Sequence, residues 1–108
     1  MADRSKLFSS KATTERTIKI EGEEYAVHVR RLPALDLRKF HAEVLSDSID
    51  TRAEAGFEAI AKACRNEDGS EFASVGELRR FKPEAVKALM EVFTEVNTSK
   101  PDDDLGNG

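Results

Sequence analysis

Three side chains of this chain are of the types that carry nucleophilic or metal chemistry: Cys64, His28 and His41. A thiol beside an imidazole can act as a nucleophile, and the same residue types bind zinc. However, Cys64 lies on the apolar side of a predicted helix, where small thiols are common core residues, and His28 falls on the polar side of a predicted strand. No orienting carboxylate or oxyanion-hole motif accompanies them, and three scattered ligands are too few for zinc. We therefore predict no catalytic residue, no cofactor and no metal site, and we expect the protein not to be an enzyme.

The acidic stretch Asn66-Glu67-Asp68-Gly69-Ser70 has the composition of a calcium-binding loop. If Gly69 took the place of the invariant glycine of such a loop, Cys64 would stand at the first ligand position and Val75 at the last. Both of those positions need carboxylates. The stretch therefore indicates a turn that ends a helix.

The charges of the chain are mixed in sign, with a net charge of -4 and 35% charged residues. An acidic total argues against a nucleic-acid partner, because affinity for a duplex comes from neutralising phosphates. Two basic pairs, Arg30-Arg31 and Arg79-Arg80, are flanked by acidic segments, which favours a solvated face or ion pairs within the fold. The alternative is contact with an acidic partner segment, such as Asp102-Asp103-Asp104 of a neighbouring subunit.

The length of 108 residues predicts one domain with a single core. One cysteine excludes an internal disulfide and fits a reducing compartment. The N-terminus lacks the apolar segment of a signal peptide, and no run approaches the roughly 20 apolar residues of a membrane span. We expect a cytoplasmic protein without a membrane partner.

Alternating apolar residues predict a β-hairpin over residues 16–31. If Gly22-Glu23 is the two-residue loop, Ile20 faces Tyr25 and Ile18 faces Val27. The apolar side chains then share one face, which helices must cover because a lone hairpin is marginal in water. The free edges of such a hairpin could pair with another chain.

Helical spacing predicts three main helices and one short helix. The first covers residues 34–45, and its buried face comprises Leu37, Phe40, His41, Val44 and Leu45. The second covers residues 51–65 with Asp50 as N-cap, and its apolar face comprises Ala53, Phe57, Ile60, Ala61 and Cys64. A capping box, Ser74-Val75-Gly76-Glu77, opens a short helix to about Phe81. The last covers residues 83–96, ends at Asn97, and carries the stripe Val86, Leu89, Met90, Phe93 and Val96.

Together these elements predict an α+β fold: an N-terminal β-hairpin packed with three main α-helices plus a short capped helix. Residues 1–15 are expected to form a flexible arm, residues 16–97 a single domain, and residues 98–108 a disordered acidic tail. The candidate partner-binding residues lie on two helical stripes, which in most proteins belong to the core, and on one basic pair: Phe57, Ile60, Ala61, Arg79, Arg80, Met90 and Phe93.

The order of these pieces resembles the tail assembly chaperones of long-tailed bacteriophages and prophages. The resemblance covers residues 17–97. It rests on Val27-His28-Val29-Arg30-Arg31-Leu32, on Ala34-Leu35-Asp36 leading to Phe40, on Asn66-Glu67-Asp68-Gly69-Ser70-Glu71-Phe72, on Ser74-Val75-Gly76-Glu77-Leu78 and on Glu95-Val96-Asn97.

This resemblance implies a non-enzymatic chaperone that self-associates and coats the long, helical, apolar tape measure protein in the host cytoplasm. Such chaperones are absent from the mature virion. In several phages a frameshifted, longer form recruits tail tube protein, and the acidic tail here could join such an extension. Two other functions stay open: a small bacterial adaptor or regulatory interaction module, and a structural component of a phage tail.

Overall fold

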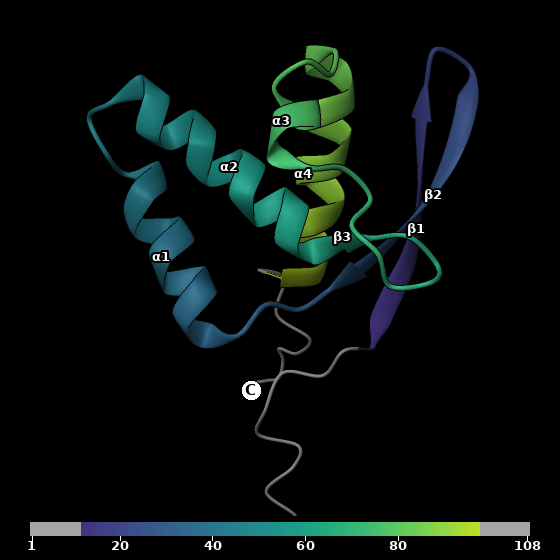
Figure 1. The fold of residues 1–108 in the computed structure, drawn as a ribbon, viewed down its shortest axis with the longest axis horizontal. Coiled ribbons are helices and arrows are strands. Elements are labelled where there is room, and N and C mark those ends of the chain that lie inside the picture. Colours follow the sequence, from purple (N-terminus) through teal and green to yellow (C-terminus); the bar gives the residue numbers. More distant parts are fainter. Residues whose placement is uncertain (1–11, 98–108) are drawn as a thin grey trace, which may run out of the picture.

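A computed structural model describes residues 12–97, which form a three-stranded sheet and four helices. Strands β1 (Thr13–Ile20) and β2 (Glu23–Arg30) make an antiparallel hairpin, and the short β3 (Cys64–Arg65) pairs with β2, so the sheet order is β1-β2-β3 (Figure 1). The helices are α1 (Ala34–Val44), α2 (Ile49–Ala63), α3 (Val75–Leu78) and α4 (Pro83–Asn97). The predicted α+β class, with a hairpin packed against helices, is confirmed.

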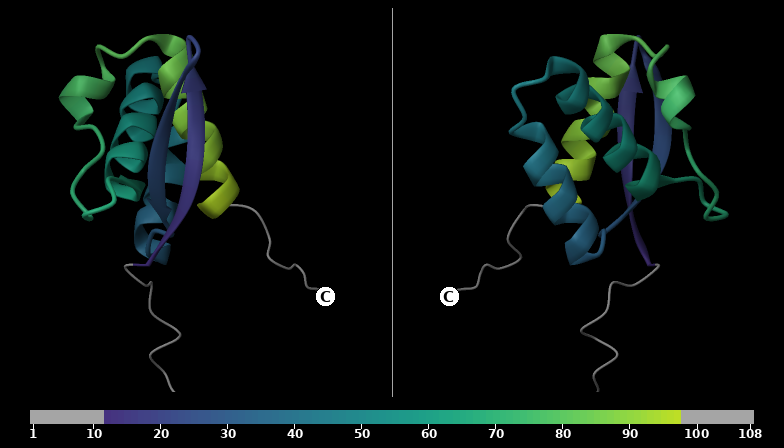
Figure 2. Two further views of the ribbon diagram at one scale, coloured as in Figure 1. Left: turned by 90° about the vertical axis from the view of Figure 1, so that its right-hand side faces the viewer. Right: turned by 60° about the vertical axis from the view of Figure 1, so that its left-hand side comes forward.

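The helices form a layer on one side of the sheet. Helix α4 packs on β1 and β2, and α2 packs on α4 and β3, whereas α1 lies on the far side of α2 from the hairpin (Figures 1 and 2). Strand β1 begins at Thr13, three residues before the start of the predicted domain at residue 16. The rest of the predicted arm, residues 1–11, and the predicted acidic tail, residues 98–108, lie outside the described residues.

The register of the hairpin differs from the predicted one. Ile18 pairs with Tyr25 and Ile20 pairs with Glu23, so the two loop residues are Glu21 and Gly22. Both loop residues have positive φ, 52° and 85°, as in the turn type whose twist matches a two-residue hairpin. The predicted loop was therefore wrong by one residue. The shared apolar face survives, because a pairing shift of two residues leaves every side chain on the same side of the sheet.

The start and the end of α2 also differ from the prediction. The N-cap is Ser48, whose Oγ accepts a hydrogen bond from the Thr51 amide at 3.2 Å, and Asp50 lies in the first turn. The helix ends at Ala63, because Cys64 takes an extended conformation and pairs with Val29 of β2. The third strand was missed in the sequence, since two residues are too few to show an alternating pattern.

The core lies between the sheet and helices α2 and α4. Its largest fully buried side chains are Phe93, Ile60, Leu78, Leu89, Val27 and Val29. The buried face predicted for α1 forms only in part: Leu37 and Phe40 pack half-buried against the core, but no residue of α1 is fully buried. His41 is exposed, and Leu45, just beyond the helix, is 82% exposed. Phe40 reaches the core at its edge, with its ring 5.2 Å from that of Phe93 in an edge-to-face contact.

A buried amide fixes the end of α4. The Asn97 side chain is the polar group buried in this core: its Oδ1 accepts a hydrogen bond from the Leu32 amide at 2.7 Å. Its Nδ2 donates to the carbonyl oxygens of Arg30 and Phe93, at 3.0 Å and 3.2 Å. Asn97 therefore joins the end of the helix to the segment that leaves β2.

The predicted capping box is confirmed at α3. Ser74 Oγ accepts from the Glu77 amide at 3.1 Å, and Glu77 Oε1 accepts from the Ser74 amide at 2.9 Å. The helix itself ends at Leu78, before the predicted Phe81.

Candidate functional site: a groove between α2 and α4

An open groove of about 1020 Å³ runs between the first half of α2, helix α3 with the residues after it, and the length of α4. Its floor is apolar and its rim is charged. The apolar lining residues are Ala53, Gly56, Phe57, Leu78, Phe81, Pro83, Val86 and Met90. The charged lining residues are Arg52, Arg79, Lys87, Glu91 and Glu95.

The close approach of α2 and α4 at this groove depends on a glycine. A Cβ atom at Gly56 would lie 3.2 Å from the terminal methyl of Met90, which is closer than ordinary van der Waals contact. The absent side chain lets Met90 lie directly against the backbone of α2. The flexible methionine forms an adaptable part of the groove floor.

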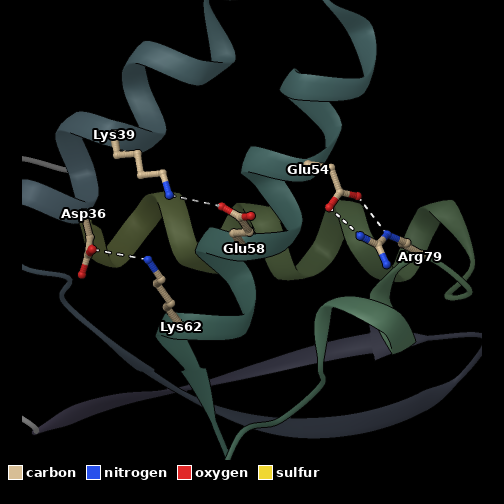
Figure 3. A network of polar contacts seen from close by, with 6 residues as sticks. All are labelled: Asp36, Lys39, Glu54, Glu58, Lys62 and Arg79. Atoms are coloured by element: carbon tan, nitrogen blue, oxygen red, sulfur yellow. Dashed lines mark hydrogen bonds and ion pairs between the residues drawn. The ribbon is translucent and has the colours of Figure 1, made fainter.

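The rim is ordered by an ion pair between α2 and the end of α3. The Arg79 guanidinium donates two hydrogen bonds to the Glu54 carboxylate, at 2.6 Å and 2.9 Å (Figure 3). These bonds lower the pKa of Glu54 and raise that of Arg79. Both side chains are solvent-exposed, so the pair positions the rim more than it stabilises the fold.

The charges of the rim change from positive to negative along α4. Lys87 lies nearer the start of the helix, and Glu91 and Glu95 follow toward its end. Glu95 accepts a hydrogen bond from Arg16 of β1 at 2.8 Å. Within residues 12–97, Lys87 makes no ion pair. The groove thus has a basic end at Arg79 and Lys87 and an acidic end at Glu91 and Glu95.

The predicted partner-binding residues separate into three places. Phe57, Arg79 and Met90 line the groove. Arg80 lines a second, smaller hollow of about 360 Å³ between the hairpin and the start of α4. Ile60, Ala61 and Phe93 are at most 4% exposed, so their side chains are covered by the chain's own core. Those three residues hold α2 and α4 in place beneath the groove and present no surface to a partner.

Four residues that line the groove were not among the predicted site residues: Ala53, Gly56, Val86 and Lys87. Ala53 and Val86 had been assigned to core-facing stripes. The available signal was the pair of small residues at Ala53 and Gly56, spaced by three on one helix, which permits a second backbone to come close. That signal does not say whether the space is filled by the chain itself or left open.

The candidate nucleophile and ligands are not brought together. Cys64 aligns with Val29 on the core side of the sheet, whereas His28 aligns with Arg65 and points to the other side. Burial raises the pKa of the Cys64 thiol to about 12. Within residues 12–97, no group of three or more His, Cys, Asp or Glu side chains could hold a metal ion.

The acidic turn after β3 is organised by its own hydrogen bonds. Asp68 Oδ1 accepts from the Ser70 hydroxyl at 2.6 Å and from the Ser70 amide at 2.9 Å, which lowers the pKa of Asp68. Gly69 has a φ of 91°, and its amide donates to the Asn66 carbonyl. These contacts are those of a tight turn.

Comparisons with protein-family models, with curated proteins and with solved structures found no match for this chain. None of the helices within residues 12–97 is long and apolar enough to cross a membrane.

Proposed function

We propose that this protein is a phage or prophage tail assembly chaperone that holds apolar helical segments of a tape measure protein in the groove between α2 and α4. The proposal unites the resemblance of the sequence with one observation, the apolar groove with a charged rim. Grooves of this kind bind the apolar face of an amphipathic helix. The 15 residues of α4 run about 22 Å, so the groove would accept about four turns of a partner helix.

The chemistry of the groove suits a partner of low sequence specificity. Phe57 and Met90 provide an aromatic and a flexible thioether surface, which adapt to different aliphatic side chains. Charged residues at both ends select polar flanks rather than a particular motif. Many copies along one long helix need only modest affinity each, because neighbouring copies add avidity.

The proposal includes self-association of the chaperone in the host cytoplasm and its absence from the mature virion. It also includes recruitment of tail tube protein by a longer form of the chain with a frameshifted extension. After expression of the gene with its downstream neighbours, a blot with an antibody against residues 1–16 should reveal the longer form. A stained gel of the proteins that co-purify with it should show the long helical protein.

The groove itself is tested by Ala53→Glu in the same co-expression. Ala53 is exposed, so the variant should fold, but its carboxylate would stand at the mouth of the apolar groove. We expect the helical partner to become insoluble. The matched control is Ala34→Glu, an exposed position on α1 outside the groove, which should keep the partner soluble. A substitution at Ile60 would not serve, because that side chain is buried in the core.

A soluble partner with Ala53→Glu would contradict binding in this groove. Recovery of the 12.0 kDa chain from purified virions would instead favour a structural tail component. Co-purification with a small toxin-like protein would favour the adaptor function.

A further inference from the structure

The corner between α1 and α2, residues Leu45 to Asp50, exposes two large aliphatic side chains. Leu45, which directly follows α1, is 82% exposed, and Ile49, the first residue of α2, is 72% exposed. Single exposed aliphatic residues are ordinary, but two at the tip of a rigid corner form a projecting apolar knob.

Hydrogen bonds within the connection and from α2 hold this corner in place. The Ser48 amide donates to Ser46 Oγ at 3.0 Å, and Ser48 Oγ in turn accepts from the Thr51 amide. Arg52, also in the first turn of α2, donates a hydrogen bond from Nη1 to the Ser46 carbonyl oxygen at 2.7 Å. The corner is therefore pre-organised, and little conformational entropy is lost when a partner covers it.

The charges around the knob are opposite to those at the basic end of the groove. Asp47 and Asp50 flank Leu45 and Ile49 and are exposed. The groove presents Arg79 and Lys87 beside the apolar floor formed by Phe57 and Met90. The acidic apolar knob thus complements the basic end of the groove, where Lys87 makes no ion pair within residues 12–97 and Arg79 is paired with Glu54.

We propose that the α1–α2 corner of one copy docks in the α2–α4 groove of a second copy. The two surfaces are adjacent, because Arg52 both lines the groove and contacts the Ser46 carbonyl of the corner. Docking is therefore reciprocal, with each corner in the other copy's groove, as in a two-fold dimer whose single patch is self-complementary.

This inference rests on the self-association contained in the proposed function and names the surfaces that make it. Because the corner and the helical partner occupy the same groove, the dimer is the form of the chaperone without its partner. Reciprocal docking keeps the apolar floor out of water until a helical segment displaces the corner.

The test is the mass of the purified full chain, measured by light scattering over a series of concentrations. Wild type should form a dimer. The variant Leu45→Ser/Ile49→Ser should bind itself at least about 100-fold more weakly, because the two reciprocal contacts together lose four aliphatic side chains. Both side chains are exposed in the monomer, so the unfolding midpoint should not fall. Leu35→Ser, which removes an equally exposed leucine at the other end of α1, should leave the dimer intact.

A mixing experiment tests whether the α1–α2 corner of one copy contacts the α2–α4 groove of the other. Ala53→Glu blocks the groove but keeps the corner, and Leu45→Ser/Ile49→Ser removes the corner but keeps the groove. Each should be monomeric alone, and a 1:1 mixture should form a heterodimer through one of the two contacts. Monomeric wild type, an unaffected corner variant, or a mixture that stays monomeric would each overturn the docking.

The outcome is separable from that of the proposed function. The corner variant keeps its groove, so it should still hold the helical partner in solution. If wild type is monomeric and still keeps that partner soluble, the docking and the self-association are wrong, and the binding of the helical partner in the groove stands. If wild type dimerises through the corner but retains no helical partner, the docking stands and the chaperone proposal is wrong.

Discussion

Asn97 joins two parts of the fold through a buried side chain. Its side-chain amide accepts a hydrogen bond from the Leu32 amide, beyond the end of β2, and donates one to the carbonyl oxygen of Arg30, the last residue of that strand. A buried polar group left without a partner costs about 1 to 3 kcal/mol. The stability of the β2–α1 connection therefore depends on one residue of α4.

We predict that Asn97→Leu lowers the free energy of unfolding by about 2 to 4 kcal/mol, because two main-chain groups lose their partner at once. Urea unfolding of the full chain measures the change. Asn66→Ala is the comparison, since it removes hydrogen bonds from an exposed turn and should cost less. Equal effects of the two substitutions would contradict a special role for Asn97.

Because of Cys64, the free energy of unfolding should fall as the pH becomes alkaline. Its thiol is 1% exposed, and burial raises its pKa to about 12. In an unfolded chain the thiol ionises near pH 8.5. The contribution of the buried neutral thiol to the free energy of unfolding is therefore fully present below that pH. The contribution is lost as the pH rises from about 8.5 toward 12.

We therefore expect wild type to lose about 2 kcal/mol more than Cys64→Ala when the pH is raised from 8 to 10. The measurement is the free energy of unfolding of both proteins at the two pH values. The cavity left by the alanine lowers stability equally at both and cancels in the comparison. Identical losses would show that the thiol is accessible in the folded protein.

At the scale of elements, the hairpin turn is strained at one residue. Glu21 has a φ of 52°, a left-handed conformation that costs a non-glycine residue on the order of 1 kcal/mol, and asparagine tolerates it better. Glu21 also pairs with Lys82 at the start of α4, so a direct substitution would mix two effects.

We expect Glu21→Asn to raise the free energy of unfolding by about 0.5 to 1 kcal/mol when it is made in a Lys82→Ala background. In that background the ion pair is already absent, and only the turn conformation changes. Thermal unfolding of the single and double variants gives the difference. A lower stability of the double variant would mean that the turn does not need asparagine's conformational freedom.

The sequence predicted an element well where a local pattern determines it. It predicted bounds and turns less well where contacts with the rest of the chain determine them. The capping box at Ser74 and Glu77 uses only local hydrogen bonds, so it was found correctly. The loop of the hairpin was misplaced, because Gly22 suits either central position of a tight turn. Asp50 and Ser48 are both good capping residues, and only the path of the chain decides between them.

Helix α1 forms the outermost layer of the molecule and is the least firmly packed of its long helices. Helix α1 has no fully buried residue and packs mainly on α2, assisted by two ion pairs, Lys62 with Asp36 and Lys39 with Glu58 (Figure 3). Exposed pairs of this kind contribute little. The apolar spacing of α1 predicted a buried face, but α2 and α4 already occupy the covering layer of the sheet.

We predict that the amides of α1 exchange hydrogen faster than those of α2 and α4, because opening α1 uncovers only the edge of the core at Leu37 and Phe40. Native-state hydrogen exchange followed by mass spectrometry measures this. If docking through the corner occurs, protection of α1 should rise with protein concentration. Protection of α1 equal to that of α4 at every concentration would contradict the independent opening of α1.

Phe57, Arg79 and Met90 were predicted to bind a partner and do line the groove, but the sequence did not predict that an open groove exists there. Periodicity separates apolar from polar faces, but it does not tell a face covered by the chain from one left open. Phe93 and Met90 belong to the same stripe of α4, yet Phe93 is fully buried and Met90 lines the groove. The difference arises from where α2 crosses α4, which is a property of the assembled molecule.

The start of β1 and the end of α4 lie at the same pole of the molecule, joined by the contact of Arg16 with Glu95 (Figure 2). The hairpin turn and the α1–α2 corner lie toward the opposite pole (Figure 1). A label or a solid support attached beyond either residue 12 or residue 97 would therefore orient every copy alike, with the corner outward. A circular permutant that joins these two ends through a short linker and opens the chain at Asp68-Gly69 would keep the contacts of the sheet and the helices and lose only those of that exposed turn.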